Sequence, residues 1–180
     1  MSLFLAWMPD GAALEQLCAL RDRLRAHAQD SRWTAWRKDA QLHMTLRYLA
    51  DEAPSANTGL REAIDAAVAN HAQIDMQFDR IEAWPPALVV RTSPNDALSA
   101  FLKDLDVAAV ACGYPRMRTQ TPHLTLAYPP RGIRGNTLAL PTPDDSAPLP
   151  LVARIRNISV VQTETGRGYR AIATWPLQSA

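Results

Sequence analysis

The sequence has little cysteine and no long apolar segment. Its 180 residues include only Cys18 and Cys112, too few for the disulfide framework of a small secreted domain or for a Cys-rich zinc site. The apolar segment near the start, residues 3–8, is six residues long and has no basic run before it, so it predicts neither a signal peptide nor a membrane span. These absences predict a soluble, cytoplasmic protein.

Motifs of several common enzyme classes are also missing. The sequence contains no Gly-Lys-Ser/Thr of a Walker-type phosphate loop, no His-Glu-x-x-His zinc motif and no Gly-x-Ser-x-Gly nucleophile turn. It therefore predicts no metal site and no bound cofactor, and the chemistry has to come from other residues.

The composition is that of a folded protein with an uneven charge. Hydrophobic residues make up 47% and charged residues 21% of the chain, which excludes a disordered or fibrous protein and fits a single domain over residues 1–180. The net charge is only +1, but residues 107–143 contain four arginines and no acidic residue. Such a segment suits an anionic ligand, and a solvated basic surface explains it equally well.

Hydrophobic periodicity predicts a mixed α+β fold. The predicted helices are residues 12–28, 58–70 and 96–111. The predicted strands are residues 3–8, 42–49, 74–84, 87–91, 121–128, 151–163 and 168–175, with a long Pro-rich loop at 129–150 and a closing hairpin through Gly166. In the second of these strands, alternation places Leu42, Met44, Leu46 and Tyr48 on one face and His43, Thr45, Arg47 and Leu49 on the other.

A short motif occurs twice in strand-like segments. His43-Met44-Thr45-Leu46 and His123-Leu124-Thr125-Leu126 lie 80 residues apart, each after a predicted strand and helix. The repetition predicts two pseudo-symmetric lobes of antiparallel sheet, with helices outside and a central cleft that carries both motifs. The other two histidines, His27 and His71, fall at predicted helix ends and are interpreted as surface or capping residues.

The paired motif suits the cleavage of a phosphate ester. In a strand, the His and Thr of each motif project from one face, roughly 6.5–7 Å apart. One imidazole can take a proton near neutral pH while the other gives one, and threonine hydroxyls can donate hydrogen bonds to anionic oxygens. The two motifs together therefore predict acid–base chemistry on a phosphate without a metal.

The motifs resemble the double His-x-Thr signature of the 2H phosphoesterases, above all the LigT-like RNA 2',3'-cyclic phosphodiesterases, or 2'-5' RNA ligases. The likeness extends to Arg32-Trp33 before the first motif, Tyr48-Leu49-Ala50 after it, Pro122 before the second and the hairpin at residues 158–177. Ala50 stands where these proteins usually have glycine, and Thr165 where they usually have serine.

The resemblance implies hydrolysis of a 2',3'-cyclic phosphate at an RNA end to a 2'-phosphomonoester, with 2'-5' ligation as the reverse type of reaction. It implies His43 as the general acid and His123 as the general base, with Thr45 and Thr125 holding phosphate oxygens. The implied partners are RNA ends or nucleotides that bear a 2',3'-cyclic phosphate, and the implied assembly is a monomer.

Substrate contacts are harder to assign. Many relatives have an arginine where this sequence has Tyr128, so Arg118, Tyr128 and Arg131 are the candidate substrate-binding residues. Two other functions stay open: a cyclic phosphodiesterase for a small nucleotide, and a non-catalytic RNA-binding module. Trp33 and Trp36 could stack on a base, although tryptophans beside a strand more often belong to the core.

Overall fold

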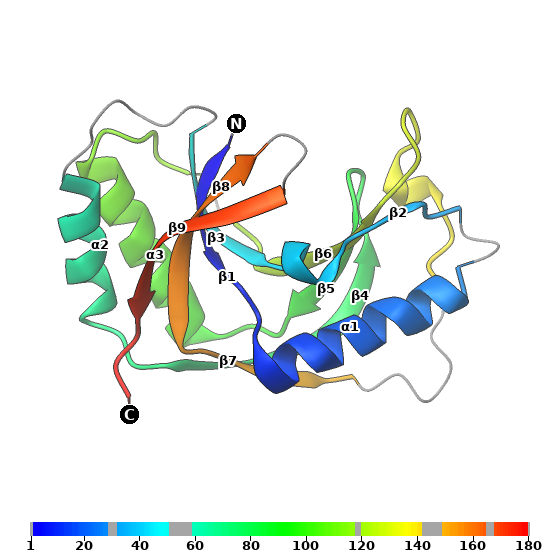
Figure 1. The fold of residues 1–180 in the computed structure, drawn as a ribbon, viewed down its shortest axis with the longest axis horizontal. Helices are drawn as coiled ribbons and strands as arrows, with labels where there is room; N and C mark the ends of the chain where they lie inside the picture. The colour runs from blue at the N-terminus through cyan, green and yellow to red at the C-terminus, as the bar shows by residue number, and fades with distance from the viewer. Residues whose placement is uncertain are drawn as a thin grey trace.

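The computed structural model describes residues 2–28, 32–50, 59–117, 120–141, 149–164 and 168–179. In it, three helices pack against one curled, mainly antiparallel sheet, which confirms the predicted α+β class (Figure 1). The helices are α1 (Gly11–Ala26), α2 (Gly59–Val68) and α3 (Asp96–Ala111). The strands are β1 (Leu3–Trp7), β2 (Ala35–Trp36), β3 (Met44–Ala50), β4 (Ile74–Ala83), β5 (Leu88–Thr92), β6 (His123–Tyr128), β7 (Leu151–Ile155), β8 (Asn157–Glu164) and β9 (Gly168–Pro176).

The sheet consists of two halves that meet at the motif strands. Its order is β7-β4-β5-β6-β3-β1-β8-β9, with β2 paired to the end of β6. Between β6 and β3 the pairing is limited to Met44 opposite Leu124, so the four strands on each side form a separate lobe. The predicted pair of lobes is therefore confirmed, with one motif strand at the inner edge of each.

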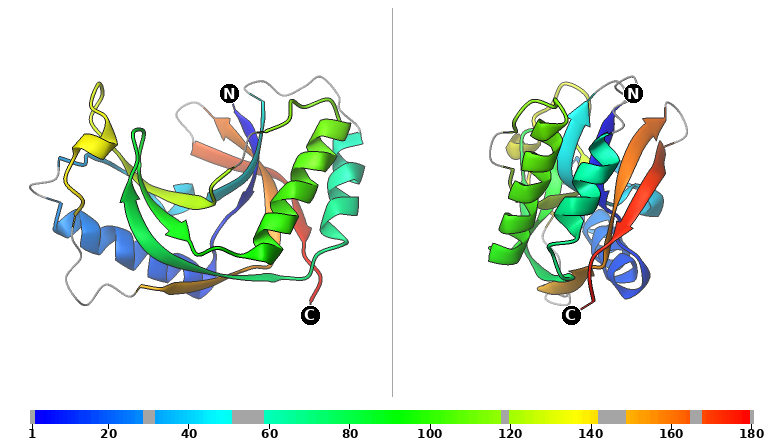
Figure 2. Two further views of the ribbon diagram at one scale, coloured as in Figure 1. Left: turned by 180° about the vertical axis from the view of Figure 1, so that it is seen from behind. Right: turned by 90° about the vertical axis from the view of Figure 1, so that its left-hand side faces the viewer.

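The helices cover one face of both lobes. Helix α1 lies along the β4, β5 and β7 half, whereas α2 and α3 lie together beside the β1, β8 and β9 half (Figures 1 and 2). Apolar side chains from the helices and the sheet form one large core on this face. Because Met44, Leu46, Leu124 and Leu126 are all buried in that core, the alternate residues of both motif strands point away from the helices.

Three details of the strands differ from the prediction, and the first is the two-residue strand β2, which the sequence did not predict. The predicted strand 151–163 is two strands, which Arg156 separates: β7 pairs with β4 in one lobe, and β8 pairs with β1 in the other. The chain thus crosses between the lobes at a position that no glycine or proline marks.

The alternation predicted for residues 42–49 is correct only as far as Leu46. Leu5 pairs with Arg47 and Ala6 with Thr45, so one residue of β3 is left over and the strand contains an irregularity there. Beyond it the faces are exchanged: Arg47 is buried on the helix side, 2% exposed, and Tyr48 packs instead near Phe4 in a small second cluster.

None of the helices in the described ranges is long and apolar enough to cross a membrane.

Candidate active site

The two motifs lie side by side where the lobes meet. The antiparallel register about Met44 and Leu124 places His43 across from Thr125, and Thr45 across from His123. All four side chains lie on the face that the helices leave uncovered, and a diagonal pair such as the two histidines has Cβ atoms roughly 7–8 Å apart in a regular ladder. The arrangement joins residues 80 positions apart into one cluster with approximate two-fold symmetry.

Both imidazoles are oriented by the same local contact. Nδ1 of His43 lies 2.9 Å from the carbonyl oxygen of Gln41, and Nδ1 of His123 lies 2.8 Å from that of Thr121. A carbonyl oxygen can only accept, so Nδ1 carries the proton in each neutral ring. Each Nε2 is then the nitrogen that can take up or release a proton in the site.

Aromatic rings surround His43. The Phe4 ring lies 5.1 Å from the imidazole between centroids, and the Tyr169 ring packs edge-on at 4.8 Å. Burial is the main cause that lowers the pKa of His43 to about 4; the Gln41 carbonyl opposes this effect, and the positive charges of Arg37 and of protonated His123 contribute to it. In the ligand-free protein His43 is therefore neutral at neutral pH.

His123 has a less enclosed setting. The ring of Trp84, from the turn between β4 and β5, lies 4.5 Å away and is tilted by 55°. Burial is the main cause that lowers the pKa of His123, and the charge of Arg91 on the adjacent strand β5 adds to it. Arg91 is itself paired with Glu82 at 2.9 Å, and the same carboxylate accepts a 2.7 Å hydrogen bond from the Trp84 indole.

Arg37 approaches the site between two tyrosines. Its Cζ lies 5.5 Å from the ring centroid of Tyr128 and 5.2 Å from that of Tyr169, and its Nη2 donates a hydrogen bond to the Tyr169 hydroxyl. Tyr169 also contacts His43, so the guanidinium is one aromatic ring away from the imidazole. The site therefore combines two proton-transfer groups, two hydroxyls and a cation on one face.

Comparisons with known proteins agree with this geometry. A family model of the 2'-5' RNA ligase superfamily matches residues 13–167, which include both motifs. The chain belongs to this superfamily. Comparison with curated proteins gives no significant match.

Several solved structures of other proteins have the same fold as this superfamily member. Escherichia coli LigT complexed with 3'-AMP is 18% identical, with a TM-score of 0.72 over 98% of this chain and 97% of that one. The protein TT0787 of Thermus thermophilus is 16% identical, with a TM-score of 0.73 over 99% of both chains. The PDE domain of MHV ns2 is more distant, at 12% identity and a TM-score of 0.56 over 99% of both chains.

The structure places only one of the three candidate substrate-binding residues of this superfamily member beside the site. Tyr128, at the end of β6, is 37% exposed and borders the site through Arg37. Arg131 is exposed in the turn that follows, and it forms no hydrogen bond or ion pair with any residue that the structure describes. Arg118 lies outside the described residues.

The other predicted candidates are accounted for by packing. Trp33 is 4% exposed and its indole donates to the carbonyl of Ala139, so it is a core residue, whereas Trp36 is half-buried. His27 caps the end of α1 and contacts the Arg23 carbonyl. His71 is not a free surface residue, because its Nε2 lies 2.8 Å from a carboxylate oxygen of Asp104 on α3.

The sequence reasoning missed the residues that surround the histidines. These are Phe4, Arg37, Trp84, Arg91 and Tyr169. Only Trp84 had a local signal, because it precedes the double proline that turns β4 into β5. The others reach the site through strand pairing and the curl of the sheet, for which one sequence carries no signal.

A close approach behind Trp84 fixes its turn. The amide of Gly135 donates a 2.8 Å hydrogen bond to the carbonyl of Pro85. A Cβ at Gly135 would lie 2.3 Å from the Trp84 carbonyl oxygen and 2.6 Å from the Trp33 ring, so only glycine fits. The loop after β6 thus supports the residue that packs on His123.

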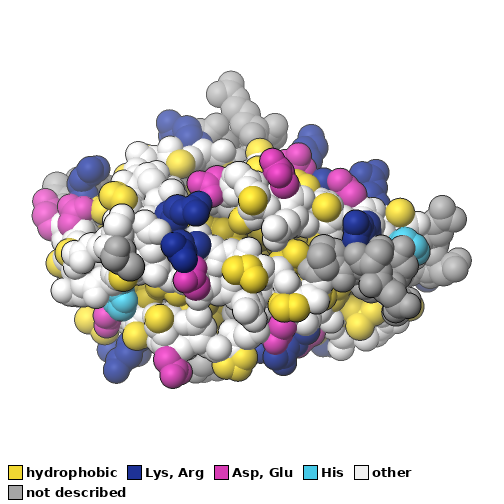
Figure 3. All heavy atoms as spheres, turned by 90° about the horizontal axis from the view of Figure 1, so that it is seen from below, with side chains coloured by type: hydrophobic (Ala, Val, Ile, Leu, Met, Phe, Trp, Pro, Cys, Tyr) yellow, Lys and Arg dark blue, Asp and Glu magenta, His cyan; other side chains and the backbone are white. Residues whose placement is uncertain are grey.

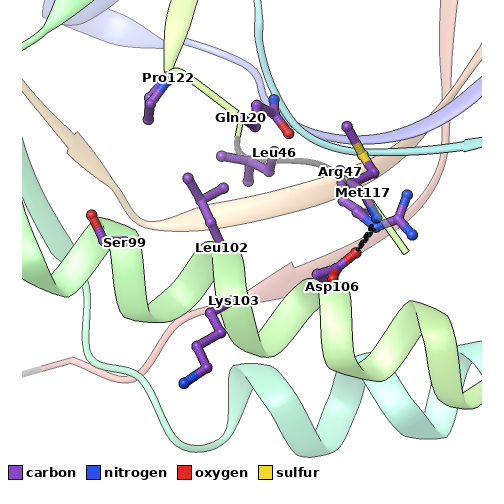
Figure 4. A pocket seen from close by; sticks show the side chains of 9 residues that line it. All are labelled: Leu46, Arg47, Ser99, Leu102, Lys103, Asp106, Met117, Gln120 and Pro122. Carbon is purple, nitrogen blue, oxygen red and sulfur yellow. Dashed lines mark hydrogen bonds and ion pairs between the residues drawn. The ribbon is translucent and has the colours of Figure 1, made fainter. Parts of the chain in front are cut away.

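The strands of the site have a cavity on their other side. It has a volume of about 340 Å³ and lies between β3, α3 and the segment before β6 (Figure 4). Arg47 and Asp106 form an ion pair of 2.9 Å at one end of it, and Gln120 donates from its amide to the carbonyl of Thr45. The cavity therefore backs the motif strands, and it does not open between the two histidines.

Charge is mixed on the face that carries α1 and β7. There, basic and acidic side chains of the described residues are interspersed, with apolar side chains between them (Figure 3). Among the described residues, no group of three or more His, Cys, Asp and Glu side chains is arranged to hold a metal ion.

Proposed function

We propose that this protein hydrolyses 2',3'-cyclic phosphates at RNA ends to 2'-phosphomonoesters, with His43 and His123 as its acid–base pair. The observation that carries the proposal is the convergence of both His-x-Thr motifs on one uncovered face at the junction of the lobes. Each imidazole there has its Nδ1 held by a backbone carbonyl, which leaves two Nε2 atoms for proton transfer.

The proposed reaction is a single in-line displacement. Nε2 of His123 takes a proton from water as the water oxygen attacks phosphorus. The bond from phosphorus to the 3' oxygen breaks, and His43 donates its Nε2 proton to that oxygen. The product carries the phosphate on the 2' oxygen, and the two histidines exchange protonation states through solvent before the next turnover.

The ligand-free pKa of His43 bears on its role as the acid. A ring with a pKa of about 4 is a strong proton donor once charged, but it is rarely charged at neutral pH. An anionic phosphate within a few ångströms favours the charged ring and raises that pKa. Substrate binding would therefore favour protonation of His43, the acid. His123, the base, would be neutral at neutral pH, because its pKa is lowered from the ordinary value of histidine.

Thr45 and Thr125 have a complementary role. Each lies across the strand junction from the histidine of the other motif, where its hydroxyl could donate to a non-bridging phosphate oxygen. Charge on these oxygens rises in the transition state, and fixed donors aimed at them stabilise it. A 5'-hydroxyl in place of water would give the reverse type of reaction, which joins two RNA ends.

Relatives support a nucleotide as the ligand. Solved structures of E. coli LigT include complexes with 3'-AMP, ATP and phosphate, and each of them matches this chain in fold. A cyclic phosphodiesterase for a small nucleotide would use the same residues, so substrate size is the point to test.

The test compares two substrates and follows the product. An RNA oligomer that ends in a 2',3'-cyclic phosphate and a 2',3'-cyclic mononucleotide are incubated separately with the protein. We expect a 2'-phosphomonoester product and a higher kcat/KM for the oligomer. A higher kcat/KM for the mononucleotide would favour the small-nucleotide reading, whereas tight RNA binding with no product from either substrate would indicate a binding module.

A further inference from the structure

The backbone of Arg37 is fixed on both sides. Its amide donates a 2.8 Å hydrogen bond to the carbonyl of Leu126 on β6, and its carbonyl accepts a 3.0 Å hydrogen bond from Nη1 of Arg21 on α1. Leu126 is the residue after Thr125. Arg37, which directly follows β2, is therefore fixed next to the second motif, although it is 88 positions from Thr125 in the sequence.

The side chain of Arg37 also has contacts that orient it. The rings of Tyr128 and Tyr169 lie 5.5 and 5.2 Å from Cζ, within the distance at which a guanidinium is attracted to an aromatic face. The hydroxyl of Tyr169 accepts a hydrogen bond from Nη2. These contacts restrict the plane of the guanidinium, and a preorganised fork loses little conformational freedom when it binds a ligand.

The charge of Arg37 has no counter-charge in the described part of the chain. No carboxylate described there lies within 4.0 Å of the guanidinium, whereas Arg21, Arg47 and Arg91 each have at least one. Nε of Arg37 is buried without an acceptor, and Nη1 has no acceptor among the described residues either. A partly desolvated cation without a partner is costly, and only the Tyr169 ring lies between this cation and the His43 imidazole, whose proposed reaction requires an anionic phosphate.

We propose that Arg37 binds the substrate phosphate in this site, through Nη1 and with Tyr128 and Tyr169 holding its guanidinium in place. This inference rests on the proposed function, since it assigns a residue to the same site. It also changes the expected role of Tyr128, whose side chain supports the phosphate-binding arginine rather than contacting the phosphate. The ligand class is a phosphate monoester or diester anion next to His43.

The test measures anion binding separately from turnover. Inorganic phosphate and adenosine 2'-monophosphate are titrated into the full chain and followed by NMR, for the unmodified protein and for Arg37→Ala, Arg37→Lys and Arg154→Ala. Loss of one hydrogen bond to a charged group predicts a Kd for both anions about 10- to 100-fold higher in Arg37→Ala. Arg37→Lys should fall between, because it keeps the charge without the planar fork.

Arg154→Ala is the matched control, since Arg154 is a largely exposed arginine on the outer strand β7 that pairs with Asp75, and its Kd should be unchanged. Adenosine, which has no phosphate, should bind equally to all four proteins. An unchanged phosphate Kd in folded Arg37→Ala or Arg37→Lys overturns the inference. If these variants lose phosphate binding while the unmodified protein hydrolyses no cyclic phosphate, the anion site stands and the proposed function fails.

Discussion

Protonation of His43 should destabilise the fold as the pH falls from about 6.5 towards 4. The unfolded chain binds a proton on this ring near its ordinary pKa, whereas the folded chain binds it only near the lowered pKa of about 4. Between these values the unfolded state binds more protons, so the free energy of unfolding rises with pH in this window and is fully regained above it.

The magnitude follows from the two pKa values. Each tenfold difference in proton affinity corresponds to about 1.4 kcal/mol, so a shift to about 4 predicts a loss of about 3 kcal/mol between pH 7 and pH 4 from this ring alone. His123 adds a loss of the same sign, because its pKa is also lowered. The aromatic contacts from Phe4 and Tyr169 that keep water from the ring are the structural cause.

A variant isolates this contribution from the other titrating groups. His43→Gln removes the titration, and its free energy of unfolding is compared with that of the unmodified protein by urea denaturation at several pH values. The stability difference between the two proteins should change by about 3 kcal/mol from pH 7 to pH 4. NMR titration of the ring gives the pKa directly. A pH-independent difference, or a ring that titrates near 6.5, would refute the reasoning.

Three further predictions concern the surroundings of the site. Arg47→Met should lower the free energy of unfolding by about 3–5 kcal/mol, because it leaves Asp106 and two backbone carbonyls without their buried donor. Arg80→Met removes an exposed ion pair and should lower it by under about 1 kcal/mol. Equal losses in the two variants would contradict a special role for the buried pair. Gly135→Ala should cost about 1–3 kcal/mol in thermal unfolding, because its Cβ would overlap the Trp84 carbonyl, and an unchanged Tm would contradict the close approach. Turnover should persist in excess EDTA if the imidazoles supply both proton transfers; a loss restored by a divalent ion would show that a metal takes part.

Much of the fold could be predicted from periodicity. All three helices begin and end within a few residues of the predicted bounds, and the Gly113 that ends α3 has φ 87°. The break at Arg156 could not be predicted, because β7 and β8 read as one apolar alternation and only their different partners separate them. The irregularity in β3 was hidden for a similar reason, since register depends on the neighbouring strand.

The site was predictable only in its repeated part. His43, Thr45, His123 and Thr125 could be singled out because one motif occurs twice. Arg37 could not, because β2 is two residues long and its place beside β6 is set by tertiary pairing. The basic segment 107–143 pointed to Arg118 and Arg131, whereas among the described residues Arg37 lowers the pKa of His43 and Arg91 lowers that of His123. Charge composition can identify a basic segment of the chain, but which arginines lie near the histidines depends on the fold.

The requirement for both histidines is tested most directly by turnover of an RNA oligomer that ends in a 2',3'-cyclic phosphate. His43→Ala and His123→Ala are assayed beside the unmodified protein and His27→Ala, which alters an exposed residue at the end of α1. Loss of one positioned acid or base predicts a kcat lower by about 10²–10⁴-fold in each of the first two and unchanged in the third. Near-normal turnover by a folded His43→Ala or His123→Ala protein would contradict the two-histidine mechanism.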